Sequence, residues 1–382
     1  MHVSQELERF IDKQVEGSAM PGLACAAVVG AAVVWSHGSG WADIEHEVPM
    51  RSGTIMNVAS VSKPLTATAL LRLWEETGFD LDADIGFLLG FEVHNPHHPE
   101  APITARQLLA HRSSIKDGPA YEAGYVCGPP EEDLENWLRD FLLPGGARYS
   151  ASENFHAWAP GTASPPESPR PYSNVGYGLA SLLLAKIADM SFEEYCADRI
   201  FKPLGMRESS WLLKDTPAER YASLYSLVPD DPDELGFHGV EVLHEQLVLA
   251  RDAAPGSLFK HCLYSHPIKA DGMLRTSVDE LARFMVLYTN DGVSQGERVL
   301  ERSTLDMMFS IDPFGRALCW QGGTTRDGHA RWHHGGSDPG VGTLVILEPE
   351  LRLGILLFSN YAGPAPFLSE IYRRIQAAFS SR

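Results

Sequence analysis

Apolar residues follow two patterns along the chain, and both ends of the chain show the pattern of β-strands. Residues 21–40 contain two apolar segments separated by Gly30, which predicts a β-hairpin because glycine supplies the reversal. Near the C-terminus, residues 329–332, 341–348 and 351–359 have the same strand character. We expect the turns between these strands at residues 335–336, 339–340 and 349–350.

The middle of the chain has helical periodicity instead. Residues 64–76 place Leu65, Leu70 and Leu73 on one stripe and are followed by Gly78, a helix stop. Further helices are expected at residues 104–111, 134–143, 177–188, 191–200, 277–288 and 365–379. Strands at both termini with helices between them predict an α/β (α+β) fold, in which one sheet is built from both ends and a mostly helical domain is inserted.

This arrangement predicts two domains. Residues 1–75 and 266–382 form the discontinuous sheet domain, and residues 76–265 form the helical domain. Two irregular segments lie inside the helical part: residues 145–171 are rich in proline, and residues 221–265 are acidic and irregular. We expect both segments to shape a substrate pocket.

The composition is that of a globular protein, and the charge argues against two classes of partner. Of 382 residues, 44% are hydrophobic and 21% are charged. The formal net charge of −19 speaks against nucleic acid or an anionic membrane, because both bind basic surfaces. No apolar run approaches the roughly 20 residues of a membrane span. A small molecule is the expected partner, and the formation of a homo-oligomer is left open.

The N-terminus and the cysteines favour the cytoplasm. Residues 1–11 lack the basic start and the apolar core of a signal peptide and predict a short amphipathic helix. The five cysteines are odd in number and include no C-x-x-C, which favours reduced, mostly buried thiols. We therefore expect a cytoplasmic protein.

The pattern S-x-x-K places a serine and a lysine on one helix face, where they can act as nucleophile and base. It occurs three times, beginning at Ser60, Ser113 and Ser257. Only Ser60 and Lys63 start a strongly amphipathic helix, since the second copy falls where a helix ends and the third lacks strong periodicity. A helix start also gives Ser60 a backbone N–H that can point at a developing oxyanion. By itself the pair is equally consistent with an ordinary first helix turn.

A phenol and an amide follow the proline-rich segment. At extended spacing Tyr172 and Asn174 point to the same side, where they can relay a proton and bind an acyl carbonyl. The alternative is a tyrosine packed at a helix entrance, with Ser173 or Asn174 as the cap.

A glycine-rich strand end supplies a third candidate. The glycines after His334, including Gly336, let a substrate lie against exposed backbone, and His334 can hydrogen-bond a tyrosine or a leaving group. The backbone N–H of Ser337 can join that of Ser60 as a second oxyanion donor. His333 and His334 point to opposite faces of a strand, so only one of them can serve. The alternative is a solvated histidine.

In this order the three motifs resemble those of the class C β-lactamase-like serine hydrolases, which include β-lactamases, penicillin-binding DD-peptidases, D-aminopeptidases and family VIII esterases. The motifs of that family are S-x-x-K, Y-x-N and K/H-x-G, which here begin at Ser60, Tyr172 and His334. The likeness covers roughly residues 15–360. It implies a β-lactamase/transpeptidase-like fold, with an antiparallel sheet flanked by helices and a site in the crevice.

The resemblance also implies acyl transfer through a covalent ester on Ser60. Lys63 or Tyr172 takes the proton of Ser60, and the sequence leaves open which, because both side chains ordinarily titrate near pH 10 and each must be tuned. Asn174 orients Lys63 and the acyl group, and Tyr172 serves as the base for deacylation. No cofactor is implied. We expect a solvated loop rather than a metal site at His94, His97 and His98.

The third motif departs from the β-lactamase pattern. β-Lactamases usually have K-T-G or K-S-G, where the cation and the hydroxyl hold the carboxylate of the drug, whereas His334 and Gly335 stand here. Both changes weaken an anion clamp, so we expect a cytoplasmic carboxylesterase or amidase. Three alternatives stay open: a β-lactamase, D-Ala-D-Ala carboxypeptidase or D-aminopeptidase; an acyltransferase or thioesterase acting on a natural-product acyl group; and a non-catalytic binding homologue.

Overall fold

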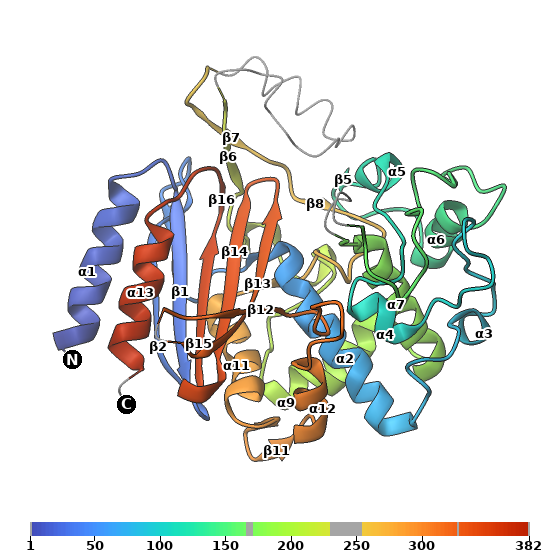
Figure 1. Ribbon diagram of the computed structural model, residues 1–382. Coiled ribbons are helices and arrows are strands. Elements are labelled where there is room, and N and C mark those ends of the chain that lie inside the picture. Colours follow the sequence, from blue (N-terminus) through green and yellow to red (C-terminus); the bar gives the residue numbers. More distant parts are fainter. Residues whose placement is uncertain (1, 166–170, 230–253, 327, 381–382) are drawn as a thin grey trace.

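A seven-stranded antiparallel sheet forms the centre of the fold (Figure 1). The computed structural model describes residues 2–165, 171–229, 254–326 and 328–380. In spatial order the strands are β12 (Gln321–Thr324), β13 (Ala330–Asp338), β14 (Val341–Glu348), β15 (Leu353–Ser359), β1 (Gly22–Val29), β2 (Ala32–Asp43) and β3 (Val48–Pro49). The two ends of the chain meet where Leu23 pairs with Ser359. The predicted sheet built from both termini is therefore confirmed.

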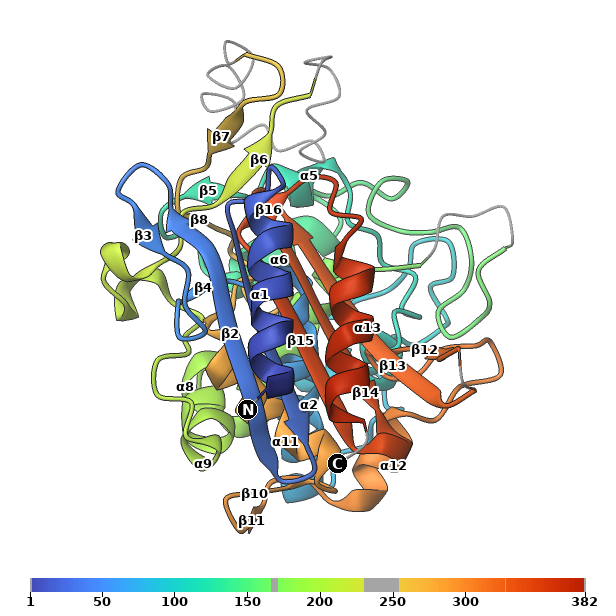
Figure 2. The same ribbon diagram turned by 90° about the vertical axis from the view of Figure 1, so that its left-hand side faces the viewer.

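Helices cover both faces of this sheet. α1 (His2–Glu16) and α13 (Leu368–Phe379) lie side by side on one face, and α11 (Val278–Thr289) packs on the other (Figures 1 and 2). Strand alternation divides the side chains of β1 between two apolar clusters: Leu23 and Cys25 face the terminal helices, and Ala24 and Ala26 face the larger core.

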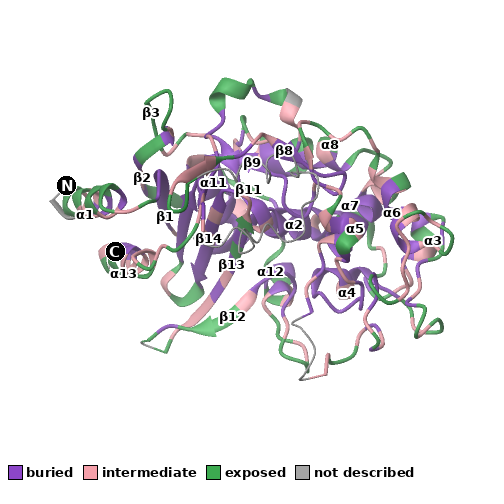
Figure 3. Ribbon diagram, turned by 90° about the horizontal axis from the view of Figure 1, so that it is seen from above, coloured by how far each residue is buried: buried purple, intermediate pink, exposed green. Residues whose placement is uncertain are grey.

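The remaining described helices pack beside the second face. They are α2 (Ser62–Thr77), α3 (Gly86–Leu89), α4 (Ala105–Leu109), α5 (Pro119–Glu122), α6 (Leu134–Leu142), α7 (Asn174–Ala188), α8 (Phe192–Cys196), α9 (Lys202–Leu204) and α12 (Arg302–Met308). Seen from above, buried residues are concentrated in the sheet, α2 and α7 (Figure 3). The predicted domain limits at residues 75/76 and 265/266 stay predictions.

Within the described ranges, no single helix is long and apolar enough to cross a membrane. α7 and the following helical segment Phe192–Leu204 meet the length and composition criteria only as a pair, and they are bent by 80° relative to each other.

One strand of the central sheet differs from the prediction. β13 continues through Gly335 and Gly336, where we expected a turn, and the reversal occurs at Pro339–Gly340. A glycine inside a strand can mark close approach of other backbone, and Gly336 has this role, because a β-carbon there would lie 2.6 Å from the carbonyl oxygen of Val58.

The two irregular segments have little regular structure. No helix or strand is assigned among the described residues of 145–171. Segment 221–265 contains β6 (Tyr225–Leu227), β7 (Leu258–Lys260) and β8 (Tyr264–Ser265), and most of its remainder, residues 230–253, lies outside the described ranges.

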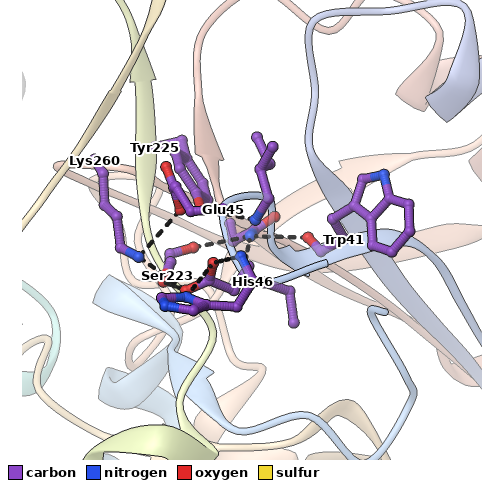
Figure 4. Close-up of polar contacts among 10 residues, drawn as sticks. Trp41, Glu45, His46, Ser223, Tyr225 and Lys260 are labelled. Carbon is purple, nitrogen blue, oxygen red and sulfur yellow. Dashed lines mark hydrogen bonds and ion pairs between the residues drawn. The ribbon is translucent and has the colours of Figure 1, made fainter. Parts of the chain in front are cut away.

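An ion-pair network ties β7 to the end of β2 (Figure 4). Lys260 Nζ lies 2.8 Å from Asp43 Oδ2 and 3.1 Å from Glu45 Oε2, and the hydroxyl of Ser223 donates to Asp43 Oδ2 at 2.6 Å. Lys260, the lysine of the third S-x-x-K copy, therefore serves to hold the loop structure.

Two of the cysteines contradict the expectation of reduced thiols. Cys127, in the short strand β5 (Val126–Cys127), forms a disulfide with Cys262, just before β8. Cys25, Cys196 and Cys319 are free and buried, as expected. The sequence argument failed because the two partners are 135 residues apart and only the fold brings them together.

Candidate active site

Ser60 lies in a tight turn directly before α2. The 3₁₀ turn Ala59–Val61 leads into the helix, and Ala59 adopts a left-handed φ of 48°. Such a conformation is uncommon for a residue with a β-carbon and tends to occur at functional sites. Lys63, one helical turn later and fully buried, places its Nζ 3.0 Å from the Oγ of partly exposed Ser60.

The second S-x-x-K copy does not form such a pair. The hydroxyl of Ser113 accepts from the N–H of Ile115 at 3.4 Å, whereas Lys116 Nζ donates to the carbonyl oxygen of Ser152 at 2.7 Å. In the third copy, Lys260 forms an ion pair with Asp43 instead. Ser60–Lys63 is therefore the copy in which the serine and lysine side chains are in contact.

Three acceptors surround the ammonium of Lys63. Besides Ser60, they are Asn174 Oδ1 at 2.6 Å and the carbonyl oxygen of Asp271 at 2.8 Å. Burial by itself lowers the pKa of Lys63, but attraction to Tyr172 in its phenolate form and to Asp271 outweighs it, so the net pKa is raised. Asn174 Oδ1 and the carbonyl oxygen can only accept. If Lys63 gives up a proton, its lone pair must therefore face the hydroxyl of Ser60.

Tyr172 completes the proton-transfer group. Burial raises the pKa of its phenol, and hydrogen bonds with Lys63 and Ser60 lower it only in part. The resting site therefore holds Lys63 as an ammonium and Tyr172 as a neutral phenol, and the two titrate as one coupled unit. Whether Lys63 or Tyr172 takes the proton of Ser60 stays open.

Two residues that the sequence analysis missed position this group. The ring of His111 stacks on that of Tyr172 with 4.2 Å between centroids, and its Nδ1 accepts from the N–H of Ser173 at 3.1 Å. Asp117 accepts from the N–H groups of Asn174 at 2.8 Å and Val175 at 2.9 Å at the start of α7. An aspartate favours a helix N-terminus, but the contact is long-range, so no local pattern predicts it.

Ser173 also serves as the helix cap that we considered as the alternative. Its Oγ accepts from the N–H of Gly176 at 2.9 Å, and its extended backbone places Tyr172 and Asn174 on the Lys63 side. Both interpretations of this motif therefore apply: Ser173 caps α7, and Asn174 contacts Lys63.

β13 approaches the turn Ala59–Val61, named the nucleophile turn after the candidate nucleophile Ser60, through Gly336. A β-carbon on Gly336 would lie 2.6 Å from the carbonyl oxygen of Val58 and 3.1 Å from Cβ of Ala59, so only glycine fits. By strand alternation, buried His334 shares this face of β13, whereas partly exposed His333 lies on the other. This placement agrees with the choice of His334, whose catalytic role stays a prediction.

The part of the β13 edge that lies near Ser60 is not paired with β12. β12 pairs with β13 only from Ala330 to His333, so within the described residues the following segment has no strand partner on that side. The nucleophile turn packs there instead. This leaves room for the expected oxyanion hole of the Ser60 and exposed Ser337 N–H groups, which also stays a prediction.

No metal-ligand cluster is evident in the part of the chain that the structure describes. The ring Nε2 atoms of His97 and His98 lie 3.2 Å and 2.8 Å from the carbonyl oxygens of Ala151 and Ala157.

Comparison with known proteins places this geometry in a family context. The chain is similar to penicillin-binding protein 4* of Bacillus subtilis, with 24% identity over 87% of this chain and 67% of that protein. It is also similar to the mitochondrial serine beta-lactamase-like protein LACTB of Mus musculus, with 35% identity over 31% of this chain and 24% of that protein. The alignments thus span about two thirds or less of these curated relatives.

Solved structures show the same fold. D-amino acid amidase of Ochrobactrum anthropi has a TM-score of 0.73 at 22% identity and covers both chains completely. The octameric penicillin-binding protein homologue of Pyrococcus abyssi has a TM-score of 0.70 at 22% identity over 98% of this chain and 76% of that chain. The Beta-lactamase family model matches residues 7–379. The chain therefore belongs to the beta-lactamase family of serine hydrolases.

Proposed function

We propose that the protein cleaves an ester or amide bond through a covalent acyl-enzyme on Ser60. The observation that carries this proposal is the 3.0 Å contact between Lys63 Nζ and Ser60 Oγ, with the other two N–H donors of Lys63 held by Asn174 and Asp271. These two acceptors fix the amine so that its third position addresses the serine.

The reaction balances as follows. The reactive form of the coupled Lys63–Tyr172 unit has first lost one proton to solvent. Ser60 Oγ then bonds to the carbonyl carbon, and its proton passes to this unit. The bond to the leaving group breaks, and the leaving group takes that proton. Water then adds to the ester with Tyr172 as the base, releases the acid and restores Ser60. The N–H groups of Ser60 and Ser337 are the proposed oxyanion donors.

The third motif supports an esterase or amidase rather than a β-lactamase. His334 is buried and Gly335 has no hydroxyl, so this strand lacks the exposed cation and hydroxyl that hold a drug carboxylate. A serine acyl-enzyme also explains an acyltransferase, so product analysis with an added alcohol or amine acceptor separates hydrolysis from transfer.

Labelling with a fluorophosphonate probe tests the proposal. We expect labelling and p-nitrophenyl ester hydrolysis in the wild type and in Ser257→Ala, the matched S-x-x-K control, and loss of both in Ser60→Ala. Labelling without turnover of p-nitrophenyl esters, nitrocefin or D-amino-acid amides would identify a binding homologue. Ester hydrolysis by Ser60→Ala at the wild-type rate would refute the mechanism.

Compartment and assembly stay proposals. A cytoplasmic location rested in part on reduced thiols, and the Cys127–Cys262 disulfide removes that support, because disulfides persist mainly in oxidising compartments. A homo-oligomer is proposed by analogy with the octameric Pyrococcus abyssi homologue, and light scattering in solution would test it.

A further inference from the structure

The hydroxyl of Tyr264 connects the two segments that carry the proposed oxyanion donors. It donates to the carbonyl oxygen of Pro339 at 3.1 Å, two residues after Ser337, and accepts from Asn57 Nδ2 at 3.2 Å. Asn57 Oδ1 in turn accepts from the N–H of Ala59 at 3.1 Å, in the nucleophile turn. Tyr264 and Asn57 are both buried. Tyr264 therefore couples the position of the nucleophile turn to that of the end of β13.

The strand that carries Tyr264 belongs to a very short ribbon. β8 pairs with β5 over two residue pairs, one of which is Tyr264 with Cys127 (Figures 1 and 2). A two-stranded ribbon is at best marginally stable by itself. The disulfide joins Cys127 to Cys262, two residues before Tyr264, so it fastens the ribbon next to this tyrosine.

The other strand of the ribbon reaches the same end of β13. Tyr125, two residues before Cys127, donates its hydroxyl to Asp338 Oδ1 at 3.3 Å. Asp338 lies between Ser337 and Pro339. Both sides of the disulfide therefore contact the segment that directly follows the proposed oxyanion donor.

The disulfide lies where a reductant can reach it. Cys127 is exposed and Cys262 is partly exposed, whereas Cys25, Cys196 and Cys319 are buried. A disulfide is broken by a thiolate that attacks one of its sulfur atoms, so access decides which bonds react. An external dithiol can therefore attack this bond while the protein stays folded.

Other contacts remain when the bond is broken. Arg275 donates to the main-chain oxygen of Tyr264, and the N–H of Gly128 donates to the carbonyl oxygen of Leu263 at 2.6 Å. These contacts hold the main chain of β8, whereas the side-chain hydrogen bonds of Tyr264 also depend on the exact position of the ribbon. We therefore expect reduction to loosen the ribbon rather than to unfold the protein.

We propose that the Cys127–Cys262 disulfide is a redox switch for the acyl-transfer site, and that Tyr264 is the positioning residue through which it acts. Reduction loosens the hold of Tyr264 on Pro339 and Asn57, so the N–H groups of Ser337 and Ser60 are no longer fixed around one oxyanion. This inference rests on the proposed acyl-enzyme function and adds a regulation of the same site.

The redox step uses a dithiol as the reductant. One thiolate of the dithiol attacks a sulfur of the disulfide, forms a mixed disulfide and releases the first cysteine thiolate. The second thiolate then attacks the sulfur of the reductant in the mixed disulfide and releases the second cysteine. The protein gains two electrons and two protons and holds two thiols, and the dithiol is oxidised to a disulfide.

Kinetics of the oxidised and reduced wild type test the switch. The protein is reduced with dithiothreitol, which is removed by anaerobic gel filtration because thiols cleave p-nitrophenyl esters, and a thiol titration confirms two additional thiols. We expect kcat for p-nitrophenyl acetate to fall about tenfold with KM unchanged, because displaced oxyanion donors act on the transition state. Reoxidation with oxidised glutathione should restore kcat.

Variants separate the switch from a general loss of stability. The double variant Cys127→Ser with Cys262→Ser should have the low kcat and no response to dithiothreitol. Tyr264→Phe keeps the ring and the disulfide but removes the hydroxyl. Its kcat should fall about tenfold in the oxidised form, and reduction should add less than about threefold, because both changes remove the same contact. The matched control Cys25→Ala removes a buried thiol that faces the terminal helices and should keep the full redox response.

Three results would overturn the inference. One is a reduced wild type that is folded by circular dichroism and keeps the oxidised kcat. Another is a reduction effect in Tyr264→Phe as large as in the wild type. The third is a reduced protein that is unfolded at the assay temperature, because the disulfide would then serve the fold alone.

The rate of fluorophosphonate labelling separates this inference from the function on which it rests. Labelling at equal rates in both redox states would overturn the switch and leave the acyl-enzyme function standing. Absence of labelling in the oxidised protein would refute the acyl-enzyme function and the switch with it.

Discussion

The close contact between β13 and the nucleophile turn makes Gly336→Ala a sharp test of the site geometry. The added β-carbon would lie 2.3 Å from Thr343 Oγ1 and 2.6 Å from the carbonyl oxygen of Val58. Rotation of the Thr343 side chain would break the hydrogen bond that its hydroxyl donates to the same carbonyl oxygen at 2.7 Å. The backbone of β13 must therefore move away from the turn that carries Ser60.

The size of the effect follows from these distances. Ordinary contacts of a β-carbon begin at 3.4 Å, so the contact with the Val58 oxygen is short by 0.8 Å. A displacement of about 1 Å between reacting groups costs on the order of a hundredfold in rate, or about 2.7 kcal/mol. The loss should fall on kcat, because the proposed oxyanion donor, the N–H of Ser337, would act in the transition state. Overpacking should also lower the free energy of unfolding by about 1–3 kcal/mol.

The adjacent glycine supplies the control. A β-carbon on Gly335 meets nothing closer than the main-chain oxygen of Thr343 at 3.9 Å and points to the exposed face. We expect Gly335→Ala to hydrolyse p-nitrophenyl acetate within about fivefold of the wild type, since no group must move. Initial rates for kcat and KM, with urea unfolding for stability, measure both variants.

Equal rates for Gly336→Ala and the wild type would refute the reasoning, because β13 would then not position the oxyanion donor. Equal losses in the two alanine variants would show that the motif tolerates no methyl group on either face, and the close approach to Val58 would not be the cause.

Three further predictions concern stability and proton transfer. Cys127→Ser should lower the free energy of unfolding by about 2–5 kcal/mol, measured by urea unfolding, and a reductant should destabilise the wild type but not the variant. The pKa values of Asp338, Glu122 and Asp117 are raised to about 7, 8 and 6, so the protonated form of each carboxyl favours the folded state. The free energy of unfolding should therefore decline as pH rises from about 4 to 8. This decline should be smaller in Asp338→Asn. His111→Phe keeps a ring against Tyr172 but removes the acceptor for the main-chain N–H of Ser173. We expect kcat to fall about tenfold and the pH profile of kcat to shift, with KM unchanged. An unchanged pH profile would leave His111 a purely structural role.

Much of the fold follows from local patterns. Alternation identified the strands at both ends, and helical periodicity identified α2, α6 and α11, because the period of apolar positions is set by the backbone geometry of each element. The error at Gly335–Gly336 has a physical reason. Glycine pairs favour turns locally, whereas here the pair lies inside a strand and Gly336 permits a long-range contact with the turn at Ala59.

The same distinction between local patterns and long-range contacts applies to the candidate site. Ser60 lies in the 3₁₀ turn that leads into α2 and Lys63 in the first turn of α2, so their contact could be predicted from spacing. Tyr172 and Asn174 could be placed on one side of an extended segment.

The tertiary structure decided what surrounds these residues. Three contacts join segments that are distant in the sequence: the stacking of His111 on Tyr172, the hydrogen bonds of Asp117 to the start of α7, and the disulfide of Cys127. The hydrogen bonds of Tyr121 with Asp271 and of Tyr125 with Asp338 also depend on tertiary contacts, because these aspartates lie far from the tyrosines in the sequence and show no local pattern. The sequence by itself determined the pairing of Ser60 with Lys63, since helix geometry is local. The side chains that surround this pair follow from long-range packing, which no local spacing encodes.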